Sequence, residues 1–209
     1  VLKGRVIKQL KTWQVRDTGV TARNSVTLCK EFLPCQLQYD CIGLGAGIRA
    51  ECNRLNDENL MPPELTLVPW NAGAPVLNPH EHIVPNDLKS ALNMNFYANL
   101  KAQGWWNLRQ LFYNVWRAVT QQEKFTIDQL ISIDCSTIKD VSVIHKLRDE
   151  LCQVTVTTVT AKMKLSIVKA AHDRQSPNLA DSVVIATWPV PNETPGLLTS
   201  FVAPMIIRA

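Results

Sequence analysis

The stretch that decides the fold is QLQYDCIGLGAGI, residues 36–48. Its pattern predicts a short strand over residues 36–39, an acidic residue, Asp40, where the strand ends, and a glycine-rich turn into a helix over residues 46–55. A second strand is predicted over residues 65–68, so strand and helix alternate as in a βαβ unit. The sequence therefore predicts that Asp40 presents its carboxylate at an edge of a sheet.

The glycines after Asp40 have more than one interpretation. A dinucleotide-binding fingerprint needs glycine or alanine at the sixth position counted from Gly43, where this chain has Ile48, so a nucleotide-binding α/β enzyme is a weak hypothesis. Gly43, Gly45 and Gly47 can instead bring backbone close to a phosphate or to a metal-bound carboxylate at the start of the helix. A tight turn without any ligand is the alternative.

The remaining chain continues the α/β pattern. Glycine at position 4 predicts a tight turn with a positive φ between two short strands. Periodicity predicts strands over residues 1–2 and 6–13, helices over 18–32, 95–119, 141–151 and 179–187, and a hairpin of residues 153–158 and 162–168. We expect one domain, residues 1–209, with an irregular proline-containing tail over about residues 188–209.

Composition restricts the function classes. The net charge of +4 and the isoelectric point near 8.8 permit a polyanionic partner without requiring one. Six cysteines without a C-x-x-C pair favour buried free thiols in a reducing compartment over a zinc site or a disulfide framework. No apolar run reaches the length of a membrane span, and the first residues do not resemble a signal peptide. Because the chain does not begin with Met, we expect it to be a fragment of a longer protein.

A second carboxylate stands out near the other end of the chain. Asp181 closes the segment SPNLADS, residues 176–182, at the start of the last predicted helix. Hard divalent cations prefer oxygen ligands, so two carboxylates from separate elements can hold such an ion together. The alternative is that Asp40 caps a helix and that Asp181 is an exposed acid in a first helical turn.

Four segments in order carry a family resemblance. Residues 39–47 (YDCIGLGAG), 99–109 (NLKAQGWWNLR), 130–133 (LISI) and 176–182 (SPNLADS) resemble the C-terminal nuclease domain of phage large terminase subunits. The resemblance implies an α/β, ribonuclease H-like fold with a mixed central sheet flanked by helices. It also implies Asp40 and Asp181 as catalytic, metal-binding carboxylates for two Mg²⁺ or Mn²⁺ ions.

Two departures from the family pattern bear on activity. The family's first metal aspartate lies on the first strand, and we expect that strand to be truncated here, with the aspartate upstream of Val1. Asn178 stands where related sequences carry aspartate; its amide can still ligate a metal ion but adds no negative charge. Because two-metal hydrolysis needs enough anionic ligands to hold both ions, we expect the fragment that starts at Val1 to be nearly inactive.

Basic residues near the last motif are candidate DNA contacts. Lys169 resembles a lysine near the family's active site, and Arg174, Lys164 and Lys162 lie in or near the second predicted hairpin. Lys162 and Lys164 share one strand face, so a solvated face is an equal alternative.

The resemblance implies a metal-dependent endonuclease domain that cuts concatemeric double-stranded DNA during viral genome packaging. Its implied partners are double-stranded DNA, a small terminase subunit, the capsid portal and an N-terminal ATPase domain, with no membrane. Its implied location is the cytoplasm of an infected or lysogenic bacterial host. The alternative is a catalytically incomplete ribonuclease H-like remnant that only binds DNA or protein.

Overall fold

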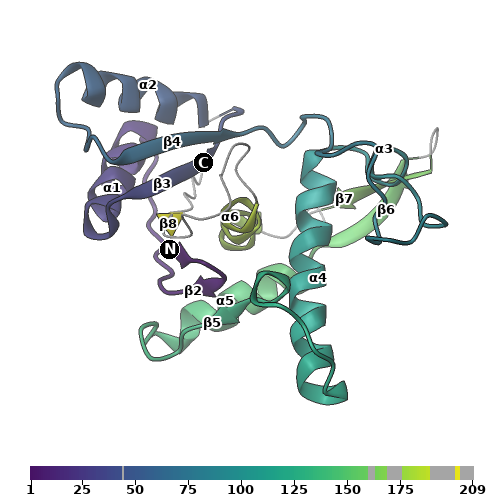
Figure 1. Ribbon diagram of the computed structural model, residues 1–209. Coiled ribbons are helices and arrows are strands. Elements are labelled where there is room, and N and C mark those ends of the chain that lie inside the picture. Colours follow the sequence, from purple (N-terminus) through teal and green to yellow (C-terminus); the bar gives the residue numbers. More distant parts are fainter. Residues whose placement is uncertain (44, 160–162, 169–175, 189–200, 203–209) are drawn as a thin grey trace.

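The computed structural model describes residues 1–209 except residues 44, 160–162, 169–175, 189–200 and 203–209. Helices surround a mixed sheet, and a separate hairpin lies at the far side of the longest helix (Figure 1). Within the described residues, no helix is both long enough and apolar enough to cross a membrane. The predicted α/β class is confirmed.

The central sheet has six strands in the order β4-β3-β8-β1-β2-β5. Its strands are β1 (Leu2–Lys3), β2 (Val6–Ile7), β3 (Cys35–Asp40), β4 (Leu65–Trp70), β5 (Ser132–Ile133) and β8 (Phe201–Val202). β1 is antiparallel to both of its neighbours, while the other pairs are parallel. As predicted, Gly4 turns the chain between β1 and β2 with a φ of 58°.

The helices match most of the predicted ranges. They are α1 (Thr18–Cys29), α2 (Gly45–Asp57), α3 (Asn93–Phe96), α4 (Leu100–Gln121), α5 (Val141–Cys152) and α6 (Asn178–Thr187), with 3₁₀ turns η1 (Lys30–Phe32) and η2 (Ile127–Gln129). The predicted hairpin is β6 (Thr155–Val159) and β7 (Lys164–Val168). The strand–turn–helix unit around Asp40 is confirmed as β3, the glycine turn and α2.

Three predicted elements need correction. The strand expected over residues 6–13 is limited to Val6–Ile7, because these are the residues that pair with β1 and β5. The helix expected from residue 95 is divided into α3 and α4, because the Asn99 side chain accepts from the Ala102 N–H and starts a new helix. The tail expected to be irregular contains β8, which lies between β1 and β3.

A small hydrophobic cluster with Tyr97 and Leu165 packs the β6–β7 hairpin against α4, and two larger clusters hold the other layers together. One lies between α1, α2 and the β3–β4 pair and includes Leu37, Tyr39 and Ile48. The other gathers α4, α5 and α6 around Trp105 and Val184. α6 lies between the sheet and α4 (Figure 1), so nearly all of its residues are buried.

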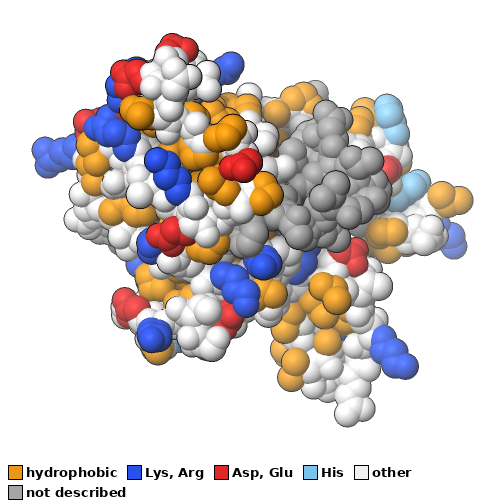
Figure 2. Space-filling view, turned by 60° about the vertical axis from the view of Figure 1, so that its left-hand side comes forward, with side chains coloured by type: hydrophobic (Ala, Val, Ile, Leu, Met, Phe, Trp, Pro, Cys, Tyr) orange, Lys and Arg blue, Asp and Glu red, His pale blue; other side chains and the backbone are white. Residues whose placement is uncertain are grey.

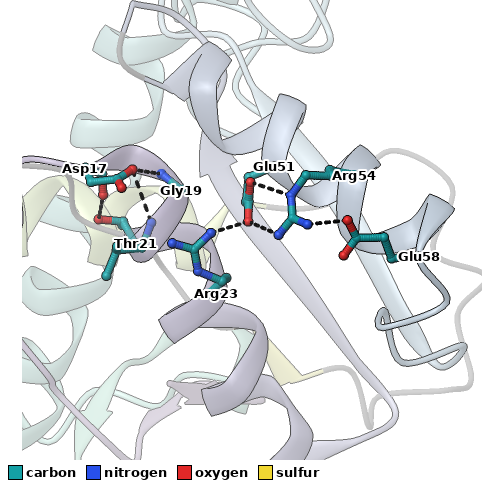
Figure 3. A network of polar contacts seen from close by, with 8 residues as sticks. Asp17, Gly19, Thr21, Arg23, Glu51, Arg54 and Glu58 are labelled. Carbon is teal, nitrogen blue, oxygen red and sulfur yellow. Dashed lines mark hydrogen bonds and ion pairs between the residues drawn. The ribbon is translucent and has the colours of Figure 1, made fainter.

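A chain of exposed ion pairs links α1 and α2 (Figure 3). Glu51 accepts from Arg23 at 2.5 Å and from Arg54 at 2.7 Å, and Arg54 also pairs with Glu58. The Arg54 hydrogen bond, together with Arg23 and against partial desolvation, lowers the pKa of Glu51 to about 2. Asp17 starts α1 by accepting from the Gly19 and Val20 N–H groups.

The cysteines are all free thiols, as predicted, but they are not all buried. Cys29, Cys35 and Cys52 belong to the cluster beneath α1 and α2, whereas Cys135 and Cys152 are exposed. Burial raises the pKa of the Cys52 thiol to about 11, so this thiol is inert at neutral pH. The sequence pattern overestimated burial for the two cysteines at exposed positions near helix and strand ends.

Candidate active site

Asp40 occupies the position that the sequence predicts for it, the last residue of β3. It lies opposite Trp70, the last residue of β4, so the two parallel strands end at the same edge. Its carboxylate Oδ1 accepts from the Ile42 N–H at 3.0 Å, which closes an Asx turn from Asp40 to Ile42. Asp40 therefore shapes the exit from the strand and does not cap α2, which begins at Gly45.

The glycine turn after Asp40 has a steric cause. A Cβ on Gly45 would lie 1.6 Å from the Asp40 carbonyl oxygen, and Gly43 has a φ of 59°. A Cβ on Gly47 would lie 2.4 Å from Thr18 Oγ1, where α2 approaches the start of α1. These contacts explain the glycines by close backbone packing; approach of a phosphate at this turn stays a prediction.

Asp181 lies in the first turn of α6, as predicted, and is half-buried. Its Oδ1 accepts from the indole Nε1–H of Trp105 on α4 at 3.2 Å. Trp105 belongs to the buried face that the helical periodicity predicts, and it is 6% exposed. The structure adds to this core role a hydrogen bond that orients the carboxylate.

The N-terminus of α6 is held by a residue that sequence reasoning missed. Pro177 precedes the helix and supplies no side-chain cap. Instead, Glu150 on α5 accepts through Oε2 from the Leu179 N–H at 2.6 Å and from the Ala180 N–H at 3.0 Å. Glu150 is 8% exposed, and an acid on the buried face of α5, next to Leu147, was the available sequence signal.

The elements that carry Asp40 and Asp181 converge around Trp70. The Trp70 side chain packs in the same hydrophobic cluster as Trp105 and the apolar residues of α6. A Cβ on Gly104 would lie 3.0 Å from Val184 and 3.6 Å from Trp70, so α4 meets both α6 and the end of β4 at this glycine. Thus β3, β4, α4 and α6 pack together around Trp70 and Gly104.

Burial also affects the residue next to Asp40. Tyr39 is 2% exposed and packs under α2. Desolvation raises the pKa of its phenol, so Tyr39 stays neutral beside the carboxylate. It serves as a packing residue that fixes the end of β3.

Asn178 is the first residue of α6, on the side that faces α5. It lines a polar cavity of about 250 Å³ together with Lys146, Glu150 and Trp13. Its predicted role as a metal ligand is not tested by these contacts and stays a prediction.

Of the predicted DNA-contacting residues, Lys164 starts β7 and is partly exposed. Lys162, Lys169 and Arg174 lie outside the described residues. On the face shown in Figure 2, Lys and Arg side chains alternate with acidic and hydrophobic ones and form no single basic patch. A DNA-binding surface thus remains a prediction for these four residues.

The donor chemistry suits a hard cation only in part. Carboxylate oxygens at Asp40 and Asp181 are the ligands that Mg²⁺ and Mn²⁺ prefer. Among the residues that the structure describes, however, no group of three or more His, Cys, Asp or Glu is placed to hold a metal ion. The role of Asp40 and Asp181 as metal ligands therefore stays a prediction.

The comparisons with known proteins concern the fold. No family model and no curated protein matches the sequence. The structure is similar to the nuclease domain of the large terminase subunit gp2 of bacterial virus Sf6, with a TM-score of 0.75 and 23% sequence identity over 90% of this chain and 80% of that one. A lysine-to-alanine variant of that domain matches with a TM-score of 0.74 in its structure with manganese and 0.75 in its structure with calcium. This chain has the fold of a large-terminase nuclease domain.

Proposed function

We propose that this chain is the nuclease domain of a viral DNA-packaging terminase and hydrolyses phosphodiester bonds of concatemeric double-stranded DNA with Mg²⁺ or Mn²⁺. The observation that carries the proposal is the structural similarity to the Sf6 nuclease domain over 90% of the chain. Asp40 at the end of β3 and Asp181 in the first turn of α6 give it a chemical basis, because both supply oxygen ligands.

In this proposal, side chains of this protein bind the metal ions and hold the metal-binding carboxylates in position. Asp40 and Asp181 would hold the divalent ions, and such ions would supply activation of water and stabilisation of the leaving oxygen. Trp105 fixes the Asp181 carboxylate through its indole N–H, and Glu150 fixes the helix that carries it. Gly45 lets α2 begin against the Asp40 carbonyl group, which fixes the other carboxylate at its strand end.

Lys162, Lys164, Lys169 and Arg174 are proposed to contact the DNA backbone. Such contacts are independent of base sequence and weaken as salt concentration rises, because bound counterions are released. The further partners proposed are a small terminase subunit, a capsid portal and an ATPase domain of the same large subunit. The proposed location is the cytoplasm of the infected or lysogenic host.

Plasmid cleavage and metal binding test the proposal together. We would incubate supercoiled plasmid with the wild-type chain, with Asp40→Asn and with Asp181→Asn, in Mn²⁺ and in chelator. Asp149→Asn is the matched control, because this acid is exposed and pairs only with its neighbour Arg148 in the described structure. Where the wild type nicks the plasmid in Mn²⁺, we expect the control to nick it at the same rate and each site variant to nick it at least about a hundredfold more slowly.

A second function is favoured by one observation, the lack of a group of three metal-binding side chains among the described residues. It is a ribonuclease H-like remnant that binds DNA or protein without cutting. Salt-sensitive DNA binding with no cleavage, and Mn²⁺ binding that is equal in the wild type and Asp40→Asn, would favour this candidate. Cleavage that is unchanged in both site variants would contradict the assignment of the carboxylates.

A further inference from the structure

A large apolar groove lies between α4, α5 and the β6–β7 hairpin, and the proposed function does not use it. Its volume is about 570 Å³, within the range of roughly 300 to 1,000 Å³ that is usual for small-molecule sites. Its walls include Trp105, Leu108 and Leu147, which are 6%, 1% and 1% exposed. The groove is therefore anchored in the main hydrophobic cluster and is preformed.

The charges at this groove have one sign. Among the described residues, the charged side chains that line it are Arg109 on α4 and Arg148 on α5, and none is Asp or Glu. Among the described residues Arg109 forms no ion pair; its guanidinium lies over the Trp106 ring, 4.7 Å from the centroid. Arg148 pairs only with the adjacent, exposed Asp149 at 2.8 Å, a contact that contributes little.

We propose that this groove binds a small amphiphilic anion, an apolar chain or ring system that carries one carboxylate or sulfonate group. The apolar body would replace water against the walls, which is favourable in proportion to the apolar area covered. The anionic group would accept charge-assisted hydrogen bonds from Arg109 and Arg148, which come from different helices. A neutral apolar ligand would form no charge-assisted hydrogen bond with either arginine.

The groove is connected to the candidate active site through one residue. Trp105 contributes its ring to the groove and donates its Nε1–H to Asp181. A ligand in the groove therefore contacts the side chain that orients the carboxylate. Trp105 and Trp106, two of the six tryptophans of the chain, line the groove, so a bound ligand should change the indole fluorescence.

Titration with dodecanoate below its critical micelle concentration tests the proposal, with dodecanol as the uncharged probe of equal chain length. We expect saturable binding of dodecanoate at one site, seen by calorimetry and by a change in tryptophan fluorescence. Arg109→Gln/Arg148→Gln should weaken binding at least about tenfold, the effect of losing one charge-assisted hydrogen bond. Arg49→Gln, at an exposed position on α2, is the matched control and should bind like the wild type.

A second arm blocks the groove without altering its charge. Cys152 is exposed and lines the groove, whereas Cys135 is exposed elsewhere. A bulky maleimide on Cys152, in a Cys135→Ser background, should prevent dodecanoate binding, and the same label on Cys135 in a Cys152→Ser background should not. Circular dichroism checks the fold of each protein. Absence of saturable dodecanoate binding to the wild type would overturn the proposal. Binding that survives both the double arginine variant and the Cys152 label would overturn it equally.

Discussion

Replacing Glu150 tests how the last helix is held in place. In Glu150→Ala the Leu179 and Ala180 N–H groups, at 2.6 Å and 3.0 Å from the carboxylate, lose their acceptor. An unsatisfied buried group costs about 1 to 3 kcal/mol, and loss of an anion at a helix N-terminus adds about 0.5 kcal/mol. The polar cavity beside Glu150 admits water once the side chain is removed, and this water can hydrogen-bond the freed N–H groups and so lowers the total loss of stability. We expect the free energy of unfolding to fall by about 2 to 4 kcal/mol.

Two further variants separate the hydrogen bonds from the charge and from general surface effects. Both N–H groups use the same Glu150 oxygen, so Glu150→Gln can keep both bonds and should cost only about 1 kcal/mol for the lost charge. Asp149→Ala, at the exposed neighbouring position, should change stability by less than about 0.5 kcal/mol. Urea unfolding followed by circular dichroism measures all three. A Glu150→Ala protein as stable as Asp149→Ala would show that the carboxylate does not hold α6.

Three other changes test the site and its surroundings. Trp105→Phe removes the donor to Asp181 but keeps an aromatic ring, so Mn²⁺ affinity in the proposed site should fall about tenfold by calorimetry, whereas Trp106→Phe should leave it unchanged. Gly45→Ala introduces a Cβ 1.6 Å from a backbone oxygen, so thermal unfolding should show a loss of about 2 to 4 kcal/mol; wild-type stability would refute the observed turn. Arg54 and Arg23 lower the pKa of Glu51 to about 2, so the ion pairs of Glu51 stabilise the fold above about pH 4.5 and lose this effect as the pH falls toward 2. Glu51→Gln should therefore flatten the acid side of a plot of unfolding free energy against pH. An unchanged plot would contradict the pairing.

Tyr97, which packs against Leu165 of β7, gives a pH test at the opposite end of the scale. Tyr97 is 6% exposed, and burial raises its pKa to about 12. Because the pKa of Tyr97 is higher in the folded chain than in the unfolded chain, where it is near 10, the neutral phenol contributes fully to stability below about pH 10. This contribution is lost as the pH rises through about 12.

The parts of the fold that the sequence predicts well are those with a local cause. The unit from β3 to α2 follows from an apolar run, an acid and glycines, and the structure shows the reason in the 1.6 Å approach at Gly45. The buried stripe of α4 follows from helical periodicity, and Trp105 lies on it as expected. Asp40 and Asp181 could be located on their elements for the same reason.

The sequence alone thus determined most of the elements, their order, and the two carboxylates at element ends, because backbone preference and side-chain periodicity act over a few residues. Only the tertiary structure decided that Phe201–Val202 enters the sheet between β1 and β3, since a two-residue strand has no period and depends on its partners. Tertiary packing alone also brings the Glu150 carboxylate to the start of α6 and the Trp105 indole to Asp181. These contacts join residues 29 and 76 positions apart, a separation at which local sequence carries no information about pairing.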